Sequence, residues 1–161
     1  MGELLVAPVG WHVAAFAPFG VAVAVCDWRT FLIPDKWVVA GAGAVIVARV
    51  ASPGGAWWAV GAAVVVAVGL FALARWLAGG GLGWGDVKLS GLVALSLGGL
   101  GWLIAMIVAC FSALCWVFLA HRGDDWQAVR EARVPFGSFM VVGALASGVT
   151  LALVFDGGYV L

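Results

Sequence analysis

Charged residues are scarce in this chain of 161 residues: it contains eight Lys or Arg and eight Asp or Glu, whereas 65% of its residues are hydrophobic. No stretch is basic enough to bind the phosphates of a nucleic acid. No loop between the apolar runs is long enough to hold a separate soluble domain. The composition therefore excludes a nucleic-acid-binding protein and predicts a single membrane-embedded domain over residues 1–161.

Residues for cysteine or metal chemistry are also lacking. Cys26, Cys110 and Cys115 are odd in number and show no CxxC spacing, which argues against a disulfide framework or a zinc site. His12 and His121 have no metal-ligand partner at a suitable spacing. No serine or cysteine has the neighbouring base that an activated nucleophile needs. We therefore expect no metal, no cofactor and no covalent intermediate.

Long apolar runs dominate what is present, at about residues 4–26, 37–51, 56–77, 87–97, 100–120 and 135–155. A spanning helix needs about 20 apolar residues. Residues 87–120 as one helix would be about 50 Å long, against a hydrocarbon thickness of roughly 30 Å, and Gly98-Gly99 offers a break. We expect an all-α polytopic membrane bundle of about six transmembrane helices, in which 87–97 is a short or re-entrant piece.

The basic residues predict the orientation of this bundle. If the loops at residues 27–36, 78–86 and 121–134 lie at the same membrane face, all but one of the Lys and Arg residues lie at that face too. The exception is Arg49. The positive-inside rule then places these loops in the cytoplasm and both termini outside. No basic segment precedes the first run, so it does not resemble a cleaved secretory signal, and we expect a multi-pass protein of the plasma (inner) membrane.

Two aspartates stand at the edges of apolar runs, where a carboxylate is costly. Asp27 ends the first run and Asp86 opens the fourth. Two predicted spans separate them, and an even number returns the chain to the same side, so both are expected at one membrane face. Helix dipoles favour the protonated form at a helix C-terminus and the ionised form at an N-cap. Such a pair can share a proton, as in aspartic proteases.

Simpler interpretations exist for each acid alone, namely an N-cap for Asp86 and an ion pair with Arg29 for Asp27. Asp35 is interpreted as a helix cap, and Lys88 as a side chain that reaches the lipid head groups. The acids of the 121–134 loop, which are Asp124, Asp125 and Glu131, are expected to be solvated.

The segment 78–85 is rich in glycine and ends directly before Asp86. It is either a flexible connector or a strand whose exposed backbone pairs with an extended substrate. In the second interpretation Gly83 and Gly85 are candidate substrate-binding residues, because a glycine permits close backbone approach.

Three segments together resemble the type IV prepilin peptidase family, the GxGD-type membrane aspartyl proteases. They are residues 27–35 (DWRTFLIPD), residues 83–89 (GWGDVKL) and residues 135–139 (PFGSF). The resemblance implies that Asp27 and Asp86 are the catalytic pair. It also implies that the substrates are prepilins or pseudopilins, cut at the cytoplasmic face between a short basic leader and a hydrophobic helix.

The chain departs from the family pattern in a few places. Asp35 stands where the family often has asparagine, and Ser138 where it often has proline; both changes are expected to matter little. The four-cysteine zinc motif and the amino-terminal methyltransferase region are absent, which implies a short, peptidase-only form that does not N-methylate its product. The particular substrate, the pilus or secretion system served and the oligomeric state stay open.

Two other functions compete with the peptidase. A non-catalytic membrane assembly or transport subunit would have the same glycine-rich, weakly charged composition. An ion or proton pathway would need polar residues at mid-depth, where the runs contain mainly Ser112 and Thr150.

Overall fold

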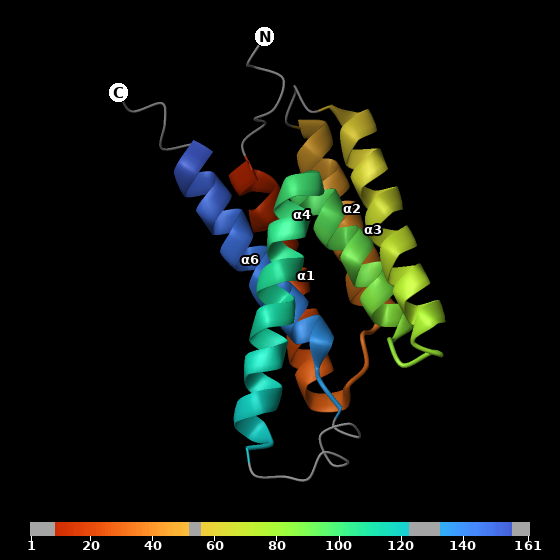
Figure 1. The fold of residues 1–161 in the computed structure, drawn as a ribbon. Coiled ribbons are helices and arrows are strands. Elements are labelled where there is room, and N and C mark those ends of the chain that lie inside the picture. Colours follow the sequence, from red (N-terminus) through yellow and green to blue (C-terminus); the bar gives the residue numbers. More distant parts are fainter. Residues whose placement is uncertain (1–8, 52–55, 123–132, 156–161) are drawn as a thin grey trace.

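The computed structural model describes residues 9–51, 56–122 and 133–155, and this part of the chain is helical without strands. Its helices are α1 (Val9–Thr30), α2 (Asp35–Ala51), α3 (Trp57–Leu77), α4 (Trp84–Ala120) and α6 (Phe136–Phe155) (Figure 1). α4 packs against α3 and α6, and α1 packs against α2 and α6. The all-α bundle is therefore confirmed, whereas Asp124, Asp125 and Glu131 lie outside the described residues.

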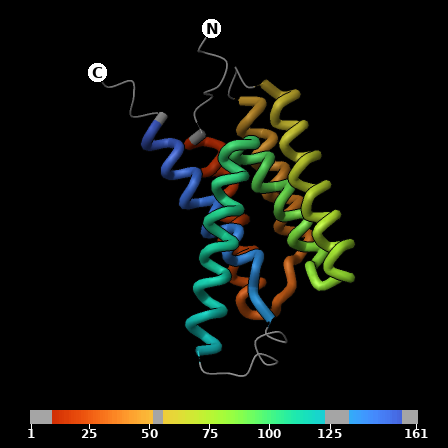
Figure 2. The backbone as a smooth tube through the Cα atoms, in the orientation of Figure 1, coloured from red at the N-terminus to blue at the C-terminus, as the bar shows by residue number. Residues whose placement is uncertain are grey.

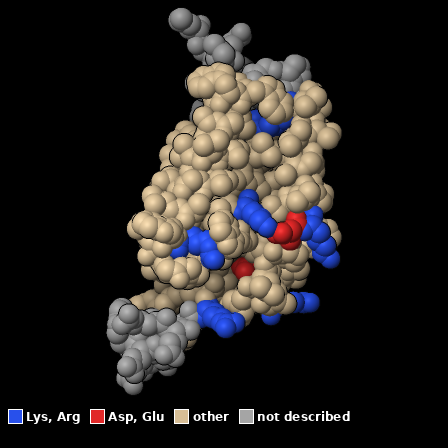
Figure 3. Space-filling view, turned by 90° about the vertical axis from the view of Figure 1, so that its right-hand side faces the viewer, with Lys and Arg blue, Asp and Glu red and all other residues tan. Residues whose placement is uncertain are grey.

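Large apolar side chains cover the outside of the bundle, among them Val47, Val65, Ile107, Phe111 and Leu153. Helices satisfy their own backbone hydrogen bonds, so such surfaces can face lipid. Figure 3 shows a face that is mostly uncharged, with the charged atoms gathered mainly in its lower half. The outer surface therefore has the character expected of a multi-pass membrane protein.

The predicted number of spans has to be corrected. By length and composition, four of the described helices can cross a membrane, namely α1, α3, α4 and α6. α2 has 17 residues and falls short of that length. The remaining difference comes from α4, which joins the two predicted runs at 87–97 and 100–120 into one element.

The chain nevertheless reverses within α4. Gly98 has φ 73° and ψ −174°, a conformation that glycine adopts at little cost. Figures 1 and 2 show α4 folding back on itself, so that it consists of two antiparallel limbs. Trp102 Nε1 donates to Ser90 Oγ at 3.0 Å, although these residues would be about 18 Å apart in a straight helix. The break predicted at Gly98-Gly99 is thus a hairpin.

The first limb of α4, residues 84–97, is about 20 Å long at 1.5 Å per residue. Its carbonyl end is held by Arg49 of α2, which donates through Nε to the Leu95 carbonyl at 2.6 Å and through Nη2 to the Ser96 carbonyl at 3.1 Å. Carbonyls at a helix end lack intrahelical partners, and in lipid an unpaired one is costly. Arg49 therefore stabilises a limb that ends short of a full membrane crossing.

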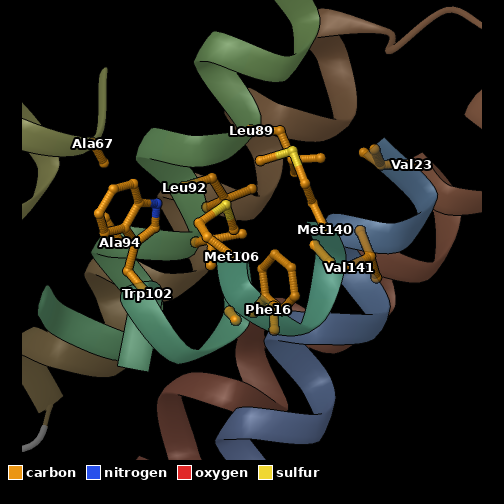
Figure 4. Close-up of a cluster of buried hydrophobic side chains, with 14 of the residues drawn as sticks. Phe16, Val23, Ala67, Leu89, Leu92, Ala94, Trp102, Met106, Met140 and Val141 are labelled. Atoms are coloured by element: carbon orange, nitrogen blue, oxygen red, sulfur yellow. The ribbon is translucent and has the colours of Figure 1, made fainter. Parts of the chain in front are cut away.

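The core draws on all five described helices, and α4 contributes more of its residues than any other helix. Figure 4 shows its largest members, which include Phe16, Leu89, Trp102, Met106 and Met140. Gly143 of α6 faces the backbone of Ala105 in the second limb of α4 at a contact that leaves no room for a side chain. This close crossing fixes how α6 packs against the second limb of α4, and the candidate site lies where α6 begins, near the end of α1.

Candidate active site

The glycine-rich loop between α3 and α4 is held in shape by Arg75, in the last turn of α3. Its Nη1 donates to the carbonyl of Gly80 at 3.2 Å and also to the carbonyl of Leu82. Its guanidinium lies over the Trp84 ring, 4.9 Å from the centroid. The loop therefore has definite partners that fix the start of α4, which the flexible-connector interpretation did not anticipate.

Asp86 had been predicted to be the N-cap of α4. It lies instead in the first turn of that helix. The helix begins at Trp84, so that Gly83 is the N-cap and Asp86 is the third helical residue. Asp86 Oδ2 accepts a hydrogen bond from the Gly83 amide at 3.2 Å. The carboxyl group thus caps the helix by bonding the amide of the N-cap residue. At this position the helix dipole still favours a negative charge.

Asp27 lies in the last turn of α1 and is only 5% exposed. Its Oδ2 accepts a hydrogen bond from the Ser138 amide at 2.8 Å and one from Ser138 Oγ at 3.2 Å. Ser138 Oγ also lies 2.9 Å from the Ala24 carbonyl. The simpler interpretation of Asp27 was an ion pair with Arg29. No such ion pair is present within the described ranges.

The hydroxyl of Ser138 suits either protonation state of Asp27. A hydroxyl has one proton to donate and lone pairs to accept with. Toward an ionised Asp27 it donates; from a protonated Asp27 it accepts, and it can then donate to the Ala24 carbonyl. Ser138 was expected to matter little, and this expectation is corrected by its contacts with the buried carboxyl group.

Ile33 lies between two glycines that directly precede these polar groups. A Cβ atom added to Gly85 would lie 2.7 Å from Ile33 Cβ, and one added to Gly137 would lie 2.7 Å from Ile33 Cδ1 and 3.1 Å from Asp27 Oδ2. The loop after α1 therefore packs directly against the starts of α4 and α6. This packing brings Asp27, Asp86 and Ser138 into one region.

Two adjoining clefts open at this region. Cleft A has a volume of about 490 Å³ and is lined by Asp27, Phe31, Gly81, Leu82, Gly83, Asp86, Arg133, Val134 and Phe136. Cleft B has a volume of about 300 Å³ and is lined by Asp27, Phe31, Leu32, Ile33, Asp35, Gly83, Trp84, Gly85, Asp86 and Lys88.

Both aspartates, Phe31 and Gly83 line both clefts, whereas Gly85 lines cleft B alone. Each cleft is thus lined by one carboxyl group from the end of α1 and one from the start of α4. All four residues predicted for the site, including both aspartates from distant parts of the chain, are therefore brought together. Two carboxyl groups in one open cleft can share a proton and polarise a water molecule.

Lys88 and Asp35 form an ion pair at the rim of cleft B, with Nζ 2.7 Å from a carboxylate oxygen and both side chains largely exposed. Lys88 therefore links the start of α2 to the start of α4. It had been expected to extend freely to the lipid head groups, and this expectation is corrected. An exposed pair of this kind contributes at most about 1 kcal/mol to stability, so its main consequence is the charge pattern at the cleft.

The fold and the site together define a polytopic helical membrane protein with paired carboxyl groups at one end of the bundle. The chain belongs to the type IV leader peptidase family, whose sequence profile matches residues 14–118. The matched range contains both aspartates and ends before α6. Comparison with the curated proteins and with the solved structures gave no match. The resemblance inferred from the sequence motifs is thereby confirmed at the level of the family.

Replacing Gly85 by alanine tests the packing of Ile33. Because the new methyl group would overlap the branched Ile33 Cβ, Gly85→Ala is expected to destabilise the protein by about 1–3 kcal/mol. Adding Ile33→Gly, which removes that Cβ atom, should recover part of this loss, with a coupling of at least about 1 kcal/mol in a double-mutant cycle. The measurement is the free energy of unfolding in detergent.

Gly43→Ala is the matched control, because nothing lies within 4 Å of its added Cβ. It is expected to be neutral, or stabilising by up to about 1 kcal/mol, as for a glycine within a helix. Equal stability of Gly85→Ala and Gly43→Ala would contradict the packing described.

Proposed function

We propose that this protein is a membrane aspartyl endopeptidase that removes the short basic leader of type IV prepilin-like substrates. The observation that carries the proposal is the convergence of Asp27 from α1 and Asp86 from α4 on the same clefts, in a member of the leader peptidase family. The lipid bilayer is the second partner, since large apolar side chains cover the outside of the helices.

The proposed chemistry uses one proton shared by the two carboxyl groups. The ionised carboxylate accepts a proton from water as the water oxygen attacks the carbonyl carbon of the scissile peptide bond. The protonated carboxyl group donates to the carbonyl oxygen and stabilises the tetrahedral intermediate. Its collapse breaks the C–N bond, and the proton taken from water passes to the amine. No covalent enzyme intermediate is needed.

The substrate is proposed to lie extended across the two clefts, because a peptide bond within a helix is shielded from attack. The backbone at Gly83, which lines both clefts, and at Gly85 can pair with such a segment. Cleavage is proposed at the cytoplasmic face. The basic residues near this end of the bundle, among them Arg29, Lys36 and Arg133, support that side by the positive-inside rule.

Replacing either aspartate by asparagine should abolish leader removal. Asn cannot exchange the proton that the reaction moves, and general acid–base catalysis contributes about 100-fold to 10,000-fold. We therefore expect Asp27→Asn and Asp86→Asn each to lower processing of a co-expressed prepilin by at least about 100-fold. Processing is measured from the mass of the substrate, and membrane insertion is checked for each variant.

Asp124→Asn makes the same chemical change in the loop predicted to be solvated, and it should process the substrate at the wild-type rate. Normal processing by Asp27→Asn or Asp86→Asn would instead favour the non-catalytic assembly or transport subunit. The comparison depends only on the acidic groups, because the substituted side chains have nearly the same shape.

Ser138→Ala tests whether the hydroxyl of Ser138 supports the reaction through Asp27. A hydrogen bond to a charged group is worth about 1.5–3 kcal/mol, so kcat should fall by about tenfold or more while KM changes little. Ser138→Thr retains a hydroxyl and should recover most of the rate. Kinetics with purified enzyme and prepilin in detergent measure both values, and an unchanged kcat for Ser138→Ala would show that the amide donor alone suffices.

A further inference from the structure

Phe31 has an unusual backbone conformation directly beside the site. Its φ is 53°, and it is the sole non-glycine residue with a positive φ in the described parts of the chain. Its amide donates to the Asp27 carbonyl at 2.8 Å and so ends α1. This is the left-handed helix termination that proteins usually build with glycine, because a Cβ atom disfavours the conformation.

The usual reason for an apolar side chain at this position does not apply. In this termination an apolar residue commonly packs against the residue four positions earlier. That residue is Asp27, whose carboxyl group is buried and faces Ser138. Phe31 is itself 43% exposed and is not part of the hydrophobic core. The phenyl group therefore stabilises neither the helix end nor the core.

Phe31 instead lines both of the clefts that the aspartates line. Phe31 is one of the few residues shared by cleft A and cleft B, together with Asp27, Gly83 and Asp86. An extended peptide positioned for attack between the carboxyl groups passes this side chain. A phenyl ring offers such a peptide an apolar surface and no hydrogen bond, so it selects for apolar side chains.

We propose that Phe31 is a specificity-determining residue that contacts an apolar side chain next to the scissile bond of the substrate. The proposal rests on the proposed peptidase function and goes beyond it, because it assigns the recognition of one substrate side chain to one residue. The left-handed conformation then has a purpose, since it holds the ring at the junction of the two clefts at a cost that glycine would avoid.

The kinetic test uses the full chain in phospholipid nanodiscs and one prepilin-type membrane protein in two versions, with leucine or alanine directly after the cut. Phe31→Gly should raise KM for the leucine version by about tenfold or more, since losing apolar contacts in a pocket costs that much discrimination. It should also reduce the preference for leucine over alanine. Its thermal midpoint should stay equal or rise, because glycine relieves the backbone.

Phe118→Ala is the control, because Phe118 is 71% exposed and lines neither cleft. It should keep the wild-type KM and substrate preference. An unchanged preference in Phe31→Gly, an equal loss for both substrate versions, or a lower thermal midpoint that accompanies the loss would each overturn the proposal.

A photo-crosslink tests the same contact without relying on turnover. A benzoyl-phenylalanine placed at position 31 of the Asp86→Asn variant should capture the leucine substrate, whereas the same group at position 118 should not. Equal capture at both positions, or none at position 31, would overturn the proposal. If the wild type cleaves neither substrate version, the proposed function fails; if it cleaves both and the Phe31 variants match it, only the present inference fails.

Discussion

A carboxyl group buried in an apolar bundle has to be hydrogen-bonded, and the rest of the site depends on how Asp27 meets this requirement. Ser138 supplies two donors to it, so the end of α1 must meet the start of α6. Ile33 then fills the space between Gly85 and Gly137, which adds the start of α4 to the same junction. Asp86 reaches the clefts because three helix ends pack together, with no direct bond between the aspartates.

Contacts at the opposite end of the bundle, near Gly98, also help to position Asp86, because they hold the far end of the first limb of α4. A first limb of about 20 Å is shorter than a bilayer crossing, and the reversal at Gly98 would leave its last carbonyls without partners. Arg49 supplies donors to Leu95 and Ser96, and the Ser90–Trp102 hydrogen bond ties the two limbs together. The limb that carries Asp86 is therefore fixed at both ends, since Arg75 holds the loop at its start.

Much of this arrangement could be predicted from local features. Long apolar runs predict the helices, Gly98-Gly99 predicts the break, and an even number of predicted crossings brings Asp27 and Asp86 to one end. The number of spans was overestimated because α2, with 17 residues, and the first limb of α4, at about 20 Å, are apolar but shorter than a full crossing. Ser138 and Ile33 were missed because their roles depend on contacts between segments far apart in the chain, which hydrophobic periodicity does not encode.

The central claim is that Asp27 and Asp86 face each other across one cleft in the membrane-embedded protein. Its most direct test is thiol crosslinking in native membranes, after Cys26, Cys110 and Cys115 have been replaced by serine. The Asp27→Cys/Asp86→Cys variant should form an intramolecular crosslink with a short bifunctional thiol reagent, whereas Asp27→Cys/Gly99→Cys, which probes the reversal beyond the first limb of α4, should not. Absence of the first crosslink, or equal yields for both pairs, would contradict the account.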